Sequence, residues 1–156
     1  TGTHPTTALC LEWLDAHDVV GKHVIDYGCG SGILAVAAAK LGAQQVWAVD
    51  YDPQALHATT LNAEKNAVNT LIHTVLPNDL PHQPTDIMLA NILAGPLIEL
   101  APLFVELVRP GGAIVLSGIL NTQADAVMQR YQPWFDMAAA TERDEWMRLS
   151  GVRKAM

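Results

Sequence analysis

The sequence predicts an α/β fold in which a mostly parallel sheet of seven strands carries helices on both faces. Val24 and Ile25 form a β-branched, apolar segment that leads into three glycines within five residues, the first at Gly28 and the last at Gly32. An alanine-rich segment with high helix propensity begins at Ile33. Strand-like and helix-like segments then alternate, and repeated βα units favour a parallel sheet with right-handed crossovers.

The other elements follow from apolar runs, caps and breakers along the chain. Pro102 is expected to kink or restart the helix that contains it, and Thr122 to cap the last helix. The tail from Met137 to Met156 is expected to hold two strands, the second antiparallel at the sheet edge. The expected helices cover residues 5–17, 33–41, 53–66, 95–107 and 123–131, and the earlier strands cover 22–27, 45–50, 71–76, 86–92 and 113–118.

The composition indicates one globular domain with an acidic balance. The 156 residues suffice for a single core, since half are hydrophobic and 16% are charged. A net charge of −7 without a basic run argues against direct nucleic-acid binding. No apolar run approaches the roughly 20 residues of a membrane span, and no signal peptide is visible, so no membrane contact is expected.

The cysteines and histidines indicate neither a disulfide framework nor a metal site. Cys10 and Cys29 have no metal-ligand spacing, and the six histidines are scattered. A reduced, cytoplasmic setting is therefore expected. The chain also lacks an obvious apolar seam, which favours a monomer.

The glycine spacing distinguishes two classes of nucleotide site. A dinucleotide fingerprint, G-x-G-x-x-G, would need its third glycine where Ile33 stands. Asp50 ends the next expected strand, about 20 residues after Gly28, as expected of an acid that accepts hydrogen bonds from both ribose hydroxyls. The alternatives are an ordinary tight turn and a capping role for Asp50. Asp52 and Pro53 already supply a cap, so the ribose is favoured.

An acid followed by three alternating glycines, from Asp26 to Gly32, resembles motif I of the class I methyltransferases that use S-adenosylmethionine (SAM). Three further segments accompany it: Gly-Thr-His-Pro-Thr-Thr at 2–7, Ala-Asn-Ile-Leu-Ala-Gly-Pro-Leu at 90–97 and Leu-Ser-Gly-Ile-Leu at 116–120. Together they resemble, over essentially the whole chain, the family that methylates ribosomal protein eleven of the large subunit. The resemblance implies a Rossmann-like class I fold that ends in a β pair. It also implies SAM as cofactor, S-adenosylhomocysteine as product, and lysine ε-amino and N-terminal α-amino groups as methyl acceptors.

The resemblance also implies a domain organisation. Members of that family carry an N-terminal substrate-recognition domain ahead of the SAM-binding domain. Because this chain begins abruptly at Thr1, within a family segment, residues 1–156 are interpreted as the catalytic domain without its substrate-recognition half. The expected partners are a large-subunit ribosomal protein and the chain's own N-terminal domain.

The family's ligand contacts carry over to matching positions. They place Thr7 near the methionine end of SAM, Gly28 against the cofactor, Asp50 at the ribose and Asn91 beside the reacting methyl group, as the catalytic residue. Related amide methyltransferases have Asn-Pro-Pro-Tyr at that point. Here Ile-Leu-Ala follows Asn91, so the aromatic that would stack on an amide or base is missing and a flexible amine is favoured. The expected cofactor-binding residues are Thr7, Asp26, Gly28, Gly30, Gly32, Asp50 and Asn91.

Several of these residues also have a structural interpretation. Thr7 could cap or back-bond in the first helical turn. Asp26 could hold the N–H groups of the glycine loop or contact SAM through water, and Asn78 or Asp79 could reach the adenine. The four tryptophans are interpreted as core or edge packing rather than a methyl-lysine cage: Trp13, Trp47, Trp134 and Trp146.

Three alternative functions are weighed against an amine methyltransferase. Methylation of a glutamine amide or a nucleic-acid base is disfavoured by the charge of −7 and the missing aromatic residue. A nicotinamide oxidoreductase is disfavoured by Ile33, and a non-catalytic SAM-binding module by the intact Asn91 and glycine loop. No residue is forced by the sequence into the role of general base, so positioning of the amine by the Asn91 carbonyl is expected to dominate catalysis.

Overall fold

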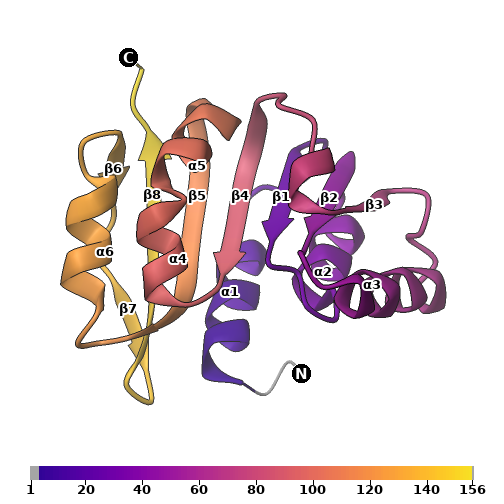
Figure 1. Ribbon diagram of the computed structural model, residues 1–156, viewed down its shortest axis with the longest axis horizontal. Coiled ribbons are helices and arrows are strands. Elements are labelled where there is room, and N and C mark those ends of the chain that lie inside the picture. The colour runs from indigo at the N-terminus through magenta and orange to yellow at the C-terminus, as the bar shows by residue number, and fades with distance from the viewer. Residues whose placement is uncertain (1–3, 156) are drawn as a thin grey trace.

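The structure is a computed structural model that describes residues 4–155. One sheet runs through the middle of the molecule, and helices pack on both of its faces (Figure 1). Thr1, Gly2, Thr3 and Met156 lie outside the described residues, so the segment at 2–7 is described from His4 onward. The strands are β1 His23–Tyr27, β2 Gln45–Val49, β3 Ile72–Val75, β4 Thr85–Asn91, β5 Val108–Leu120, β6 Phe135–Met137, β7 Thr141–Arg143 and β8 Trp146–Arg153.

The α-helices lie close to their predicted positions. The helices are α1 Pro5–Ala16, α2 Ile33–Lys40, α3 Pro53–Lys65, the short 3-10 helix η1 Pro77–Asp79, α4 Ala94–Glu99, α5 Ala101–Leu107 and α6 Ala124–Tyr131. In residues 4–155, no helix has both the length and the apolar character that crossing a membrane would need.

The strand order is β3-β2-β1-β4-β5-β8-β6, a path of seven strands. The first five are parallel, and β8 runs antiparallel to β5 and β6. The mostly parallel sheet with helices on both faces is therefore confirmed, with β7 as an eighth strand paired to β8 off the path. The chain order reverses between β1 and β4, and ligands of open α/β sheets bind beyond the strand ends at such a point.

The tail differs from the prediction in two ways. It holds three strands instead of two, because a tight turn at Asp144 and Glu145, both with positive φ, folds β7 back onto β8. The placement of the second tail strand at the sheet edge is wrong, since β8 lies between β5 and β6. Leu149 in β8 is fully buried, which suits an interior strand, whereas the three-residue β6 is a short strand of the kind that sheets place at an edge.

Prolines and caps explain most helix boundaries. Asp52 caps α3 by accepting a hydrogen bond of 2.9 Å from the Gln54 N–H, with Pro53 in the first turn. The predicted effect of Pro102 is confirmed, since the helix breaks after Glu99 and restarts as α5.

The prediction that Thr122 caps the last helix is wrong. Helix α6 starts at Ala124 without a side-chain cap. The Gln123 side chain instead accepts a hydrogen bond of 2.9 Å from the Leu120 N–H and closes the turn that precedes the helix. The Gln123 side chain is longer than that of Thr122 and reaches back three residues, so its amide oxygen accepts the hydrogen bond from the turn.

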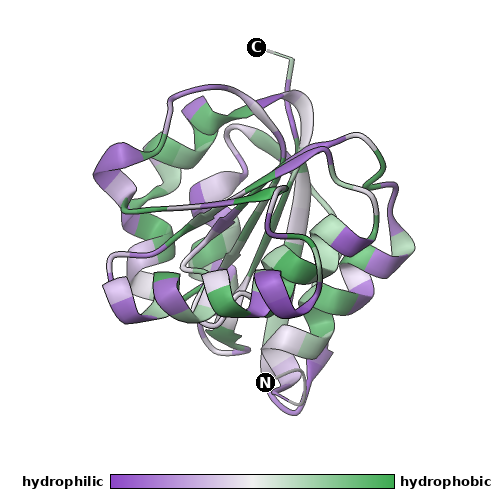
Figure 2. Cartoon of the chain, turned by 90° about the vertical axis from the view of Figure 1, so that its right-hand side faces the viewer, coloured by the Kyte–Doolittle hydropathy of each residue, from purple (hydrophilic) through white to green (hydrophobic). Residues whose placement is uncertain are grey.

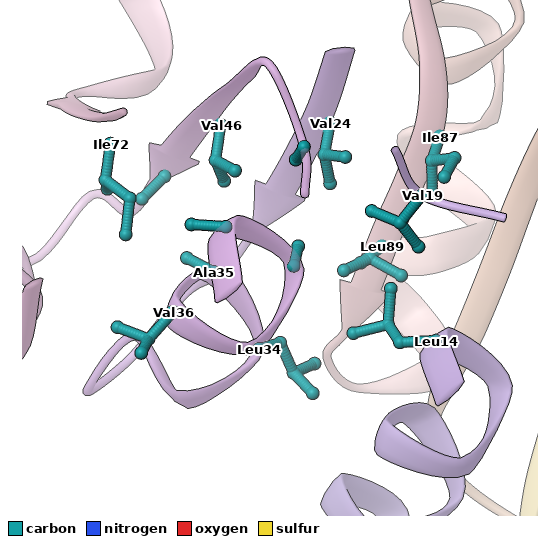
Figure 3. Packing of buried hydrophobic residues seen from close by; sticks show 14 of the residues in the cluster. Leu14, Val19, Val24, Leu34, Ala35, Val36, Val46, Ile72, Ile87 and Leu89 are labelled. Carbon is teal, nitrogen blue, oxygen red and sulfur yellow. The ribbon is translucent and has the colours of Figure 1, made fainter. Parts of the chain in front are cut away.

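Two hydrophobic clusters, one on each face of the sheet, form the core. Helices α1, α2 and α3 cover one face, and α4, α5 and α6 cover the other. Figure 2 shows hydrophobic strands at the centre and hydrophilic residues on the outward turns of the helices. Figure 3 shows the first cluster, where Leu34, Ala35 and Val36 of α2 pack among aliphatic side chains of neighbouring strands and of α1. This packing fixes the position of the turn between β1 and α2.

Candidate functional site

A cavity of about 800 Å³ opens where β1, β2 and β4 end. Four of the predicted site residues line it, from separate parts of the chain: Thr7, Gly28, Asp50 and Asn91. The other three, Asp26, Gly30 and Gly32, do not line it. The cavity thus brings together four of the seven residues that were expected to bind the cofactor, from the first helix and from strand ends.

Asp50 is held by backbone donors on both carboxylate oxygens. Its Oδ2 accepts from the Gly30 N–H at 3.1 Å, and its Oδ1 accepts from the Asp52 N–H at 3.0 Å. The carboxylate therefore also closes the turn before α3, in addition to the cap that Asp52 provides. These bonds fix the orientation of the carboxylate at the cavity wall, where its remaining lone pairs can accept from a ligand.

The glycine loop is tied down by its neighbours. The N–H groups of Gly28 and Cys29 donate to the Val49 carbonyl at 2.7 and 3.0 Å, which joins the loop to the end of β2. Helix α3 supplies two further contacts that the sequence did not predict. The fully buried Thr59 donates to the Gly30 carbonyl at 3.0 Å, and the Asn62 amide donates to the Ser31 carbonyl at 2.7 Å. Their spacing of three places both on one face of α3, but nothing in the sequence pairs that face with the loop.

Gly30 and Gly32 form a matched pair for a test of loop packing. Both have positive φ, 54° and 87°, so alanine at either position should cost about 1–2 kcal/mol of left-handed strain. A Cβ at Gly32 would also lie 2.8 Å from the Thr59 side chain, whereas nothing lies within 4 Å at Gly30. We expect Gly32→Ala to lower the free energy of unfolding by more than Gly30→Ala, because Thr59 must shift. Urea denaturation of both variants measures the difference, and equal losses would mean that Thr59 yields without cost.

Asp26 is buried within β1 and does not line the cavity. Only 1% of it is exposed, and its Oδ2 has no hydrogen-bond partner among the described residues. Burial raises the pKa of Asp26 to about 7, the backbone of Ala35 opposes this shift, and the charge of Asp50 adds to it. In residues 4–155, no hydrogen bond joins Asp26 to the N–H groups of the glycine loop. The predicted bonds from the loop N–H groups to Asp26 are therefore not seen among the described residues, and the contact with SAM through water stays a prediction.

The raised pKa of Asp26 predicts a pH-dependent stability. A carboxyl whose pKa rises from 3.8 to about 7 on folding binds its proton more tightly in the folded state, so the stability it contributes is complete below pH 3.8 and is lost as the pH rises through about 7. Asp26→Asn has no proton to lose. The free energy of unfolding of the wild type should fall relative to this variant by up to about 1.4 kcal/mol per pH unit across that window. Parallel curves in urea denaturation across the window would show that Asp26 titrates normally.

The side of the cavity around Asn91 is mostly apolar. Asn91 ends β4 beside Ser117 of β5, and its amide forms no hydrogen bond within residues 4–155, so it is available to a ligand. Ile92 and the 70% exposed Leu93 continue this wall. Glu99, at the end of α4, adds one exposed carboxylate to it.

Trp146 corrects the sequence interpretation of the tryptophans. Three of them pack as expected: Trp13 stacks on His17, Trp47 meets His73, and Trp134 lies under Arg130. Trp146, at the start of β8, instead lines the cavity, and its ring centroid lies 5.3 Å from that of His4. Their contact depends on β8 running beside β5, which the sequence did not reveal.

The two residues considered for contact with the adenine, Asn78 and Asp79, do not line the cavity, whereas their neighbour Pro77 of η1 does.

Among residues 4–155, the cysteines are not part of a metal site. Cys10 and Cys29 are buried free thiols, and burial raises the pKa of each to about 12, so they are protonated at neutral pH. Within the described part of the chain, no group of three or more His, Cys, Asp or Glu residues is placed to hold a metal ion.

Sequence comparison connects the chain to known proteins. The family model described as ribosomal protein L11 methyltransferase (PrmA) matches residues 1–154. A ribosomal protein L11 methyltransferase of Shewanella piezotolerans is 59% identical over 155 residues, which cover 99% of this chain and 53% of the relative. One of Marinobacter nauticus is 59% identical over 155 residues, covering 99% of this chain and 52% of the relative. The chain thus spans about half the length of the curated relatives it matches.

Solved structures agree in fold. The crystal structure of a ribosomal protein L11 methylase from Lactobacillus delbrueckii subsp. bulgaricus superposes with a TM-score of 0.85 at 32% identity, covering 98% of this chain and 81% of that one. An RNA methyltransferase from Salinibacter ruber, in complex with S-adenosyl-L-homocysteine, superposes with a TM-score of 0.77 at 15% identity, covering 96% and 92%, and supports the fold alone. The match over residues 1–154 and the close relatives show that this chain belongs to the ribosomal protein L11 methyltransferase family.

Proposed function

We propose that this chain is the SAM-binding catalytic domain of a protein N-methyltransferase that acts on amines of ribosomal protein L11. The observation that carries the proposal is the convergence of Thr7, Gly28, Asp50 and Asn91 on one cavity at the switch point of the sheet. Its volume of about 800 Å³ suits a nucleoside-sized cofactor together with an extended side chain. Because the chain belongs to the ribosomal protein L11 methyltransferase family, we interpret this cavity as the SAM site.

The cavity residues fit SAM, which when bound supplies a methyl group activated by its sulfonium. Asp50 accepts hydrogen bonds from the ribose hydroxyls with the lone pairs that its backbone donors leave open. The backbone of Gly28 lines the cavity and is proposed to lie along the cofactor, and the Thr7 hydroxyl serves the methionine end. The apolar wall at Ile92 and Pro96 keeps water from the reacting end.

The residues around Asn91 favour an amine as methyl acceptor. No aromatic ring follows Asn91, and the carboxylate of Glu99 on the same wall attracts a lysine ammonium group. A lysine amine has a pKa of about 10.4 in water, and an apolar wall favours the neutral form that attacks. The Asn91 carbonyl accepts an N–H of that amine and aims its lone pair at the methyl carbon. With SAM bound, the nitrogen–carbon bond would form as the methyl carbon leaves sulfur, which would keep the electron pair, and the ammonium product would lose a proton to water.

The relatives' greater length supports a second domain. Because this chain spans about half of each relative, the other half is proposed to be the N-terminal domain that recognises L11. The net charge of −7 suits a basic protein segment as substrate better than direct contact with nucleic acid. The enzyme is proposed to act as a monomer in the cytoplasm, where ribosomal proteins are made.

Calorimetric titration with SAM, S-adenosylhomocysteine and NAD tests the cofactor assignment. Binding of both sulfur compounds and not of NAD is expected, whereas binding of NAD alone would overturn the proposal in favour of an oxidoreductase. Substrate class is tested by incubating the chain, joined to the remaining half of the S. piezotolerans relative, with L11 and SAM. Mass spectrometry should place methyl groups on lysine or N-terminal amines, and methylation of glutamine would support the amide alternative.

A further inference from the structure

We propose that His4 is a positioning residue of this methyltransferase: it caps α1 as a neutral imidazole and holds the Thr7 turn against β8, so it does not act as a general base. His4 is the only histidine among the described residues that line the cavity, and it therefore stands where a base would be sought. The part of the proposal that concerns turnover rests on the proposed function. The capping role rests on the geometry alone.

Hydrogen bonds at the start of α1 define the cap. The His4 backbone is extended, with φ −66° and ψ 136°, and its carbonyl accepts from the Ala8 N–H at 2.9 Å. Its ring Nδ1 lies 3.2 Å from the Thr6 backbone nitrogen and 2.8 Å from the Thr6 hydroxyl. The N–H of N2 is one that an N-cap side chain satisfies. His4 thus does for α1 what Asp52 does for α3, and in both cases a proline follows the cap.

The cap determines the tautomer of the ring. A backbone N–H can only donate, so Nδ1 must accept and carries no proton, and the neutral ring holds its hydrogen on Nε2. The single basic lone pair of the imidazole is therefore engaged in the cap. Protonation of that lone pair would convert Nδ1 to a donor and break the bond from the Thr6 backbone N–H, and only the Thr6 hydroxyl could still accept from the ring. A general base at this position would have to give up its bond to the Thr6 backbone N–H each time it took up a proton.

The cap also connects two walls of the cavity. Thr6, 3% exposed, and Thr7 follow His4 in the first turn, and both line the cavity. The His4 ring meets Trp146 of β8 edge-on, with an interplanar angle of 62°. Fixing the His4 ring therefore fixes the Thr7 turn against β8. Loss of the cap should disturb this side of the cavity more than the Asp50 side, which α3 and the glycine loop hold.

Ring-nitrogen NMR tests the tautomer without any need for activity. In the ¹⁵N-labelled chain, His4 is assigned by the signals that disappear in His4→Asn. We expect an unprotonated Nδ1 and a protonated Nε2 at neutral pH. A protonated Nδ1 would overturn the proposal, whether or not the chain binds SAM.

Substitution separates the cap from basicity. Asparagine is among the best N-cap residues and is not a base, so turnover of His4→Asn on L11 should stay within about threefold of the wild type, whereas His4→Ala should lose about tenfold. S-adenosylhomocysteine affinity should change less than kcat in His4→Ala, because Asp50 and the glycine loop are untouched. Asp52→Ala, which removes the equivalent cap from α3, is the control for helix stability. Equal losses in His4→Asn and His4→Ala would overturn the positioning role, whereas a wild type that fails to bind S-adenosylhomocysteine would count against the proposed function instead.

Discussion

Asp50→Ala is expected to weaken binding of S-adenosylhomocysteine by about a hundredfold. A hydrogen bond to a charged group contributes about 1.5–3 kcal/mol, and each 1.4 kcal/mol corresponds to tenfold in affinity. Asp50 offers such bonds to a ribose, and it also accepts from the Gly30 N–H at 3.1 Å. The substitution therefore removes a ligand contact and releases the glycine loop together. Calorimetric titration of the wild type and the variant measures the loss.

Two matched variants separate these contributions. Asp50→Asn keeps one carbonyl oxygen that can accept from the loop or from the ribose, so its loss should be intermediate. Asp52→Ala leaves Asp50 intact and removes only the cap of α3, so S-adenosylhomocysteine affinity should change by less than about threefold. If Asp50→Ala and Asp52→Ala weakened binding equally, Asp50 would act only through the turn before α3, and the ribose assignment would fail.

The sheet and the four cavity residues were predictable because local signals and the rules of parallel sheets point the same way. Asp50 and Asn91 follow apolar strands, and the ends of parallel strands meet at one edge. Once the βα pattern is recognised, their proximity needs no knowledge of side-chain packing. Thr7 depends on more, since its position in the site follows from the resemblance to the family and not from the helix in which it lies.

What the sequence did not reveal depends on contacts between distant segments. Trp146 reaches the cavity because β8 lies between β5 and β6 rather than at the edge. Thr59 reaches the glycine loop because α3 packs across it, yet its own neighbours in the sequence are those of an ordinary helix. Asp26 was recognised as a motif residue, but its burial and its absence from the cavity wall depend on the packing around β1. In each case the residue type was visible and its surroundings were not.

Asn91→Ala is expected to leave S-adenosylhomocysteine affinity within about threefold of the wild type while turnover on L11 falls by about a hundredfold or more. The amide of Asn91 is not needed to hold β4, since it forms no hydrogen bond within residues 4–155 and the backbone pairing with β5 is independent of the side chain. Misplacement of a reacting group by about 1 Å can alone cost about a hundredfold in rate. Single-turnover methylation measures the chemical step and calorimetry the cofactor. Asn91→Asp is the matched control variant, because it keeps an oxygen acceptor but adds a negative charge beside the amine. That charge favours the protonated amine, which cannot attack the methyl group. Parallel loss of affinity and turnover in Asn91→Ala would place this residue in cofactor binding alone, and the amine would then have to be aimed by another group on the cavity wall.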